Sequence, residues 1–232
     1  MNLAVFDVDG TLLDNLASED ECFERALREG LSLSALSPNW ESYEHVSDQG
    51  IAVEAYRRQF QLLPSDEAIA RTVDLFIRLL EQAHVAQPIR AVAGANDLLA
   101  TLRERGWGIA LATGAWRRAA EFKLAAAGIH AAGLPIASAE DGPARAAIVR
   151  TAIARAEYYY AATFVRIVAI GDAVWDVDTA RALALPFVGV AQDARADRLR
   201  AIGATRVIPD FSAVLDVMEH LEESRTSVDP AP

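Results

Sequence analysis

The chain has 232 residues, 52% of them hydrophobic and 24% charged, a composition typical of a globular protein with a sizeable core. Its net charge of −11, without any basic cluster, argues against nucleic acid or an anionic membrane as a partner. There is no apolar run of the roughly 18 residues that span a bilayer, no basic-then-apolar leader, and only one cysteine, Cys22, so we predict a cytoplasmic protein without disulfides.

The segment from Leu3 to Asp14 predicts a buried strand that ends at a turn. An apolar run leads into Asp7, Val8, Asp9, Gly10 and Thr11. Residues two apart in an extended chain share a face, so Asp7 and Asp9 should point the same way. Two neighbouring carboxylates repel each other unless a cation lies between them or one stays protonated. The pair therefore indicates a metal site, a proton-transfer role or both, although an ordinary Asp-Gly turn fits the same residues.

Residues 15–87 predict a small all-helical unit. Ser18, followed three residues later by Glu21, is typical of a capping box, and Gly30 is a stop signal. Helical patterns follow at 51–60 and from about Ser65, and Pro88 ends the unit.

From residue 89 onward, predicted helices and strands alternate. Strands are expected at 107–112, 134–138, 164–170, 186–191 and 206–208, with helices between them. This alternation predicts an α/β fold, a Rossmann-like, doubly wound parallel sheet. The predicted domains are a core of 1–14 and 88–232, the inserted helical unit of 15–87, and a flexible tail at 223–232.

Three of the predicted strands end directly on reactive groups. The first delivers Asp7 and Asp9, another Thr113, and a third Asp172. Because the carboxyl ends of parallel strands line one edge of a sheet, where ligands bind, we expect these side chains to converge. Taken singly, Asp172 also fits a helix cap and Thr113 an ordinary strand-end hydroxyl.

These segments resemble three motifs of a known family. Asp7 to Thr11, the strand ending at Thr113 and Gly114, and Gly171-Asp172 with Asp176 are similar to motifs of the haloacid dehalogenase-like hydrolases. The resemblance covers essentially the whole chain, with a helical insert where that family has its cap. It implies a Mg²⁺-dependent phosphatase that acts on a small phosphorylated metabolite, with the sheet as scaffold and the cap as a substrate-selecting lid.

The resemblance also implies residue roles. Asp7 would attack phosphorus and form an aspartyl-phosphate, and Asp9 would protonate the leaving group and then deprotonate water. Thr113 and the Gly114 amide would bond the phosphoryl oxygens. The implied Mg²⁺ site comprises Asp7, the Asp9 carbonyl, Asp172 and Asp176; such hard oxygen ligands, with no His or Cys nearby, favour Mg²⁺ over zinc.

The sequence departs from the family pattern at one position. The family usually has a lysine after the strand that follows the second motif, whereas residues 139–145 contain none. Lys123, the only lysine in the chain, lies ten residues beyond Thr113, roughly 15 Å along a helix, and is expected to be too distant. Arg145 is the candidate replacement, because a guanidinium can hold a phosphate oxygen and a carboxylate at once. An exposed arginine in a first helical turn is the alternative.

Polar residues near the helical unit are weaker candidates for substrate contacts. His45, Ser47 and Asp48 could contact the substrate's leaving group, and Asn15 could face the active site too. A helix cap at Ser47 or Asp48 and a surface histidine fit the same segment.

Two other functions fit parts of this pattern. A phosphomutase forms the same aspartyl-phosphate but returns the phosphoryl group to the substrate. A phospho-receiver or binding module also has an aspartate at a strand end, but the helical insert argues against it. A dehalogenase is disfavoured because halide displacement needs no acid such as Asp9. No sequence pattern indicates a protein partner.

Overall fold

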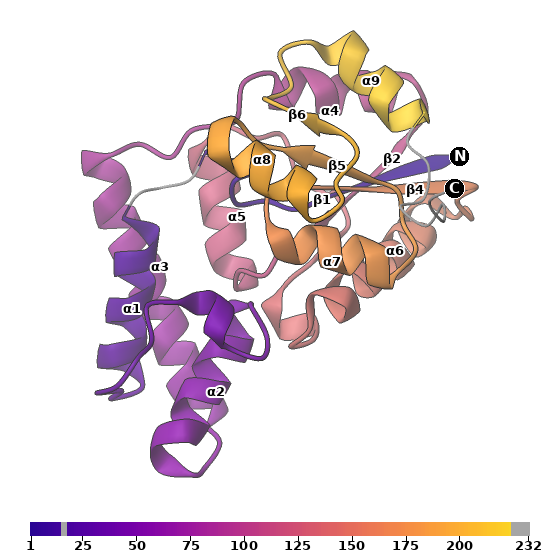
Figure 1. The fold of residues 1–232 in the computed structure, drawn as a ribbon. Coiled ribbons are helices and arrows are strands. Elements are labelled where there is room, and N and C mark those ends of the chain that lie inside the picture. Colours follow the sequence, from indigo (N-terminus) through magenta and orange to yellow (C-terminus); the bar gives the residue numbers. More distant parts are fainter. Residues whose placement is uncertain (15–17, 224–232) are drawn as a thin grey trace.

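The computed structural model describes residues 1–14 and 18–223. Asn15 and residues 224–232 of the predicted tail lie outside these ranges. Within them, six strands form one parallel sheet in the order β3-β2-β1-β4-β5-β6 (Figure 1). The strands are β1 (Asn2–Phe6), β2 (Gly108–Ala112), β3 (Ile136–Ala137), β4 (Arg166–Gly171), β5 (Phe187–Val190) and β6 (Val207–Ile208). The predicted Rossmann-like sheet is confirmed, with strands shorter than the apolar runs suggested.

Helices cover both faces of the sheet because alternate strand residues point to opposite sides. Phe6 of β1 packs in a cluster with apolar residues of α4 (Ala95–Glu104), α5 (Arg117–Ala126) and α9 (Val214–Glu223). Val5 packs on the other face against α6 (Arg145–Tyr160), and Ala169, which is paired with Val5, belongs to the cluster of α7 (Val174–Ala182) and α8 (Asp193–Ala201).

Helix α9 was not among the predicted elements. It buries Val217, Met218 and Leu221, which lie on one helical face, against the same side of the sheet as α4.

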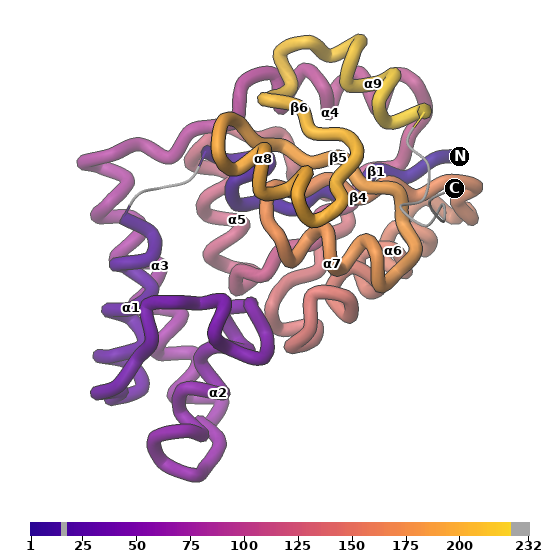
Figure 2. Tube along the Cα trace, in the orientation of Figure 1, coloured from indigo at the N-terminus to yellow at the C-terminus, as the bar shows by residue number. Residues whose placement is uncertain are grey.

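The described residues 18–87, called the helical unit below, contain no strand. They form α1 (Glu19–Gly30), the short turn η1 (Trp40–Ser42), α2 (Asp48–Phe60) and α3 (Asp66–Ala86). In Figures 1 and 2 the three helices lie together at the lower left, apart from the sheet. Aromatic contacts connect the two parts, because the ring of the fully buried Trp116, beside β2, packs edge-on against Phe23 and Phe76.

The helix caps differ from expectation at one end of the helical unit. Ser18 does not form the predicted capping box: its backbone has φ −93° and ψ 2°, not the extended conformation of a capping residue, and its side chain makes no capping bond. Ser47 does cap α2, which begins at Asp48, because its Oγ accepts from the Gly50 amide at 3.2 Å.

None of the helices in the described ranges combines the length and hydrophobicity needed to cross a bilayer.

Candidate active site

Three carboxylates meet at the carboxyl edge of the sheet. Asp7, Asp172 and Asp176 each place one carboxylate oxygen within 4.8 Å of the others. Asp7 directly follows β1, and its amide donates to the Ile170 carbonyl at 2.9 Å. Asp176, in the first turn of α7, accepts hydrogen bonds at Oδ2 from the amides of Asp172 (3.2 Å) and Ala173 (3.1 Å). The neighbouring strands β1 and β4 thus bring together acids that are far apart in the sequence.

The electrostatics of this cluster fit a divalent cation. Burial, reinforced by Asp176, raises the pKa of Asp7 to about 8, although Arg145 opposes the shift. Burial also raises the pKa of Asp172 to about 7 and that of Asp176 to about 6. The raised pKa values show that burial and the neighbouring acids disfavour ionisation of these carboxylates more than the nearby guanidinium groups favour it. Together with the oxygen-only donor set, they match the preference of Mg²⁺.

Gly10 shapes the loop beside the cluster. Its φ is +81°, a conformation that side chains rarely adopt, and a Cβ there would lie 2.2 Å from Oδ2 of Asp172. The Asp-Gly turn therefore allows close approach of the β1 loop to the Asp172 carboxylate. Thr11 strengthens this contact by donating to Oδ1 of Asp172 at 3.3 Å.

Arg145 lies beside Asp7. Its Nη1 donates to Oδ1 of Asp7 at 3.0 Å, and its Nε donates to the Val46 carbonyl of the helical unit at 2.8 Å. The guanidinium also lies 5.6 Å from the centre of the Trp175 ring. Burial alone would lower the pKa of Arg145, but Asp7 and Asp176 raise it above its ordinary value. Arg145 is therefore not an exposed arginine.

The glycine at position 114 makes room for this arginine. A Cβ on Gly114 would lie 2.5 Å from Cζ of Arg145. The backbone of the loop after β2 can therefore approach the guanidinium only without a side chain at this position.

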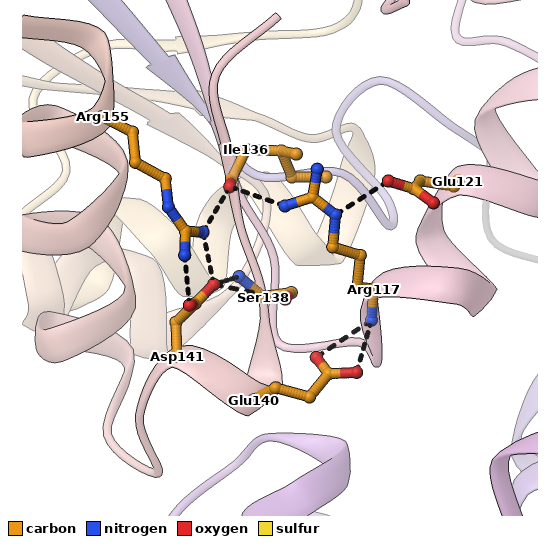
Figure 3. Close-up of polar contacts among 7 residues, drawn as sticks. All are labelled: Arg117, Glu121, Ile136, Ser138, Glu140, Asp141 and Arg155. Carbon is orange, nitrogen blue, oxygen red and sulfur yellow. Dashed lines mark hydrogen bonds and ion pairs between the residues drawn. The ribbon is translucent and has the colours of Figure 1, made fainter. Parts of the chain in front are cut away.

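The segment before Arg145 is held by charged side chains (Figure 3). Arg155 of α6 donates through both terminal nitrogens to Asp141, at 2.5 and 2.6 Å, and to the Ile136 carbonyl at 2.6 Å. Glu140 accepts from the Arg117 amide at the start of α5 at 3.0 Å. These acids brace the loop between β3 and α6.

Lys123 is the clearest correction to the sequence-based expectation. Its side chain is buried, and Nζ lies 2.5 Å from Oδ1 of Asp9 and also pairs with Glu19 at the start of α1. Distance along the helix axis was a poor guide, because α5 packs alongside the helical unit and the Asp9 loop. Burial would lower the pKa of Lys123, but Asp9 and Glu19 raise it. Lys123 thus contacts Asp9, whereas Arg145 contacts Asp7.

The loop after β2 presents hydrogen-bond donors at the same edge. The Thr113 amide continues the sheet by donating to Ala137, and its Oγ1 accepts from the Ala115 amide at 3.0 Å, which leaves its hydroxyl proton available. The Gly114 amide makes no hydrogen bond within the described part of the chain. Both groups can donate to a bound anion.

A cavity of about 530 Å³ lies between the sheet edge and the helical unit. From the core it is lined by, among others, Asp9, Gly114, Arg145, Asp172, Trp175 and Arg195, and from the helical unit by residues that include Glu19, Phe23, Trp40, Ser47, Asp48 and Phe76. Arg195 pairs with Asp172 in its wall. The volume falls in the range of sites for small molecules.

The structure places the candidate substrate contacts Ser47, His45 and Asp48 in different surroundings. Ser47 lines the cavity, but its hydroxyl is engaged, since it also donates to the Pro143 carbonyl at 3.0 Å. His45 is not among the residues lining the cavity; it lies 3.9 Å from Glu44. Asp48 also lines the cavity, and it bridges the helical unit and the core. Its place in the polar loop made it a candidate contact in the sequence, but its bonds to the core backbone were not predicted.

Comparisons with solved structures agree with this architecture. A hydrolase from Pseudomonas syringae has a TM-score of 0.70 at 22% identity, over 95% of this chain and 99% of that one. CbbY from Rhodobacter sphaeroides, solved in complex with phosphate, has 0.66 at 19%, over 92% and 96%. A predicted phosphoglycolate phosphatase from Haemophilus somnus has 0.61 at 18%, over 94% and 98%. At such identities the likeness shows the fold alone.

The sequence itself assigns the family. No curated protein matches the chain. A family model described as haloacid dehalogenase-like hydrolase matches residues 1–183, well over half of the chain. The chain therefore belongs to the haloacid dehalogenase-like hydrolases.

Proposed function

We propose that this hydrolase is a Mg²⁺-dependent phosphatase that cleaves the phosphate monoester of a small metabolite. The observation that carries the proposal is the position of Asp7, which lies within a three-carboxylate cluster and receives a hydrogen bond from Arg145 at 3.0 Å. The adjoining cavity is large enough for a small phosphorylated molecule.

In the proposed reaction, Asp7 and Asp9 divide the chemistry. A carboxylate oxygen of Asp7 attacks phosphorus, and the bond from phosphorus to the ester oxygen breaks as Asp9 donates its proton to the departing alkoxide. Asp9 then takes a proton from water, which attacks phosphorus and releases phosphate and free Asp7. Mg²⁺ bound by Asp7, the Asp9 carbonyl, Asp172 and Asp176 would offset the repulsion between carboxylate and phosphate dianion.

Three further groups stabilise the phosphoryl oxygens in this proposal. The Thr113 hydroxyl and the Gly114 amide have protons available to donate, and Arg145 carries a fixed positive charge beside Asp7. Donors already in place when charge develops lower the barrier most effectively. Lys123, through its contact with Asp9, would hold the acid–base group in position.

The test is hydrolysis of p-nitrophenyl phosphate, followed by a panel of phosphorylated metabolites, with Mg²⁺ or with excess EDTA. We expect phosphate release that EDTA abolishes and Mg²⁺ restores. Stoichiometric labelling without turnover would instead indicate a receiver. With sugar phosphates, an isomeric product without free phosphate would indicate a phosphomutase.

Replacing Arg145 should reduce turnover severely. Arg145→Ala removes a partly buried cation and the hydrogen bond that it donates to Asp7, so we expect a loss on the order of 10²–10³-fold in kcat, the range for loss of one preorganised donor. Arg145→Lys keeps the charge but has a single nitrogen, so it should recover only part of the rate. Steady-state kinetics of both variants, with Arg150→Ala of the same helix as control, would measure this effect. Near-normal turnover of Arg145→Ala would remove Arg145 from the site.

A further inference from the structure

The segment from Val46 to Gln49 connects the helical unit to the core by hydrogen bonds. Asp48 makes two of them: its amide donates to the Gly114 carbonyl at 2.8 Å, and its Oδ2 accepts from the Trp116 amide at 2.8 Å. Gln49 accepts from the Trp116 indole at 2.9 Å. Together with the contacts of Ser47 and Arg145 described above, these bonds tie one end of α2 to two loops at the carboxyl edge.

The two bonds of Asp48 hold the loop that follows Thr113. Gly114 O and Trp116 N belong to consecutive peptide groups, and within the described residues both have Asp48 as their hydrogen-bond partner. The other ends of the same peptide groups bond within the core: the Ala115 amide donates to Oγ1 of Thr113, and the Ala115 carbonyl accepts from the Ala139 amide, both at 3.0 Å. Each peptide group that flanks Ala115 is therefore held at one end by the core and at the other end by Asp48, a residue of the helical unit.

We propose that Asp48 is a positioning residue, which fixes the loop from Gly114 to Trp116 so that Thr113 and Gly114 can bind the phosphoryl group. This inference rests on the proposed function for the identity of the bound anion. Its consequence is that the phosphate-binding loop is complete only when the helical unit is docked on the core. Arg145 adds a second dependence of the same kind, because its Nε is held by the Val46 carbonyl.

The proposal predicts different behaviour for two substitutions. Asp48→Ala removes the acceptor for the Trp116 amide, whereas Asp48→Asn keeps an oxygen there and removes only the charge. In hydrogen–deuterium exchange, the Trp116 amide should exchange at least tenfold faster in Asp48→Ala and at nearly the wild-type rate in Asp48→Asn. The affinity for inorganic phosphate in Mg²⁺, measured by calorimetry, should fall about tenfold in Asp48→Ala and recover in Asp48→Asn.

Glu54→Ala is the matched control. Glu54 is an acid on the same helix that also accepts from a backbone amide, that of Glu44 at 2.8 Å, but its contacts stay within the helical unit. It should leave Trp116 exchange and phosphate affinity unchanged. Wild-type exchange and affinity in Asp48→Ala would overturn the proposal, and so would equal losses in Asp48→Ala and Asp48→Asn.

These readouts separate the inference from the proposed function. Neither requires turnover. If Asp48→Ala loosens Trp116 and weakens phosphate binding while the wild-type protein hydrolyses no ester, the positioning role stands and the phosphatase proposal fails.

Discussion

Replacing Asp7 by asparagine is expected to lower phosphate release by about four orders of magnitude or more, the range seen when a nucleophile is removed. The amide is nearly isosteric and can still accept the hydrogen bond from Arg145, but it cannot form an acyl-phosphate. Single-turnover assays with radiolabelled substrate would test both release and labelling of the protein. Turnover within tenfold of the wild type would exclude Asp7 as the nucleophile.

The same variant tests the electrostatics without any substrate. Burial raises the pKa of Asp7 from its ordinary value of 3.8 to about 8, so between these pH values the folded state retains a proton that the unfolded state has lost. This contribution to stability is complete below pH 4 and is lost as pH rises toward 8. Asp7→Asn lacks that loss, so in EDTA its stability relative to the wild type should rise between pH 5 and pH 8 by on the order of 2–4 kcal/mol.

Denaturant titrations of both proteins at the two pH values would measure this difference. If the stability difference between the two proteins is the same at both pH values, Asp7 is ionised over this whole range. Its charge would then be offset by the protein without a metal. Repeating the titrations in Mg²⁺ should reverse the order, because the wild-type cluster binds the ion more tightly.

Lys123→Met should destabilise the fold by about 3–5 kcal/mol, the usual cost of removing one partner from a buried ion pair. Methionine fills a similar volume, but it leaves the carboxylates of Asp9 and Glu19 facing each other without the ammonium between them. Turnover should also fall, by about 10²-fold, because Asp9 loses the group that orients it.

Urea denaturation would measure the loss, and a second substitution identifies its cause. Lys123→Met combined with Glu19→Gln removes one of the two facing charges, so the double variant should be more stable than Lys123→Met alone. Burial already raises the pKa of Glu19 to about 7, which shows how poorly this site tolerates an uncompensated carboxylate. Wild-type stability in Lys123→Met would contradict the account.

Local sequence patterns were enough to predict the parallel sheet and the acidic residues at its carboxyl edge. The apolar run before Asp7 and the one before Asp172 each specify a buried strand, and parallel topology requires their ends to meet. Side-chain placement in the helical unit was not predictable in this way. Helical periodicity gives the apolar face of α3, but it does not indicate which residues before and at the start of α2 contact the core.

Lys123 and Asp48 show why contacts between the helical unit and the core were missed. The partners of Lys123, Asp9 and Glu19, lie over 100 residues away in the sequence, and the contact depends on how α5 packs beside α1. Asp48 forms hydrogen bonds with the backbone of Gly114 and Trp116. Nearly every residue has these backbone groups, so the sequence does not indicate which of them a side chain will bind. Arg145, by contrast, was proposed from the sequence because a familiar motif lacked its usual cation, and it does contact Asp7.

The tight fit between Gly114 and Arg145 makes the two positions one unit for mutation. Any side chain at 114 would occupy the space of the guanidinium, so its main effect would be to displace the arginine rather than to alter the turn. In a mutational scan, a substitution at position 114 would therefore act mainly by displacing Arg145. The losses caused by substitutions at 114 and at 145 would then not add. As long as Arg145 keeps this position, glycine is the residue that fits at position 114.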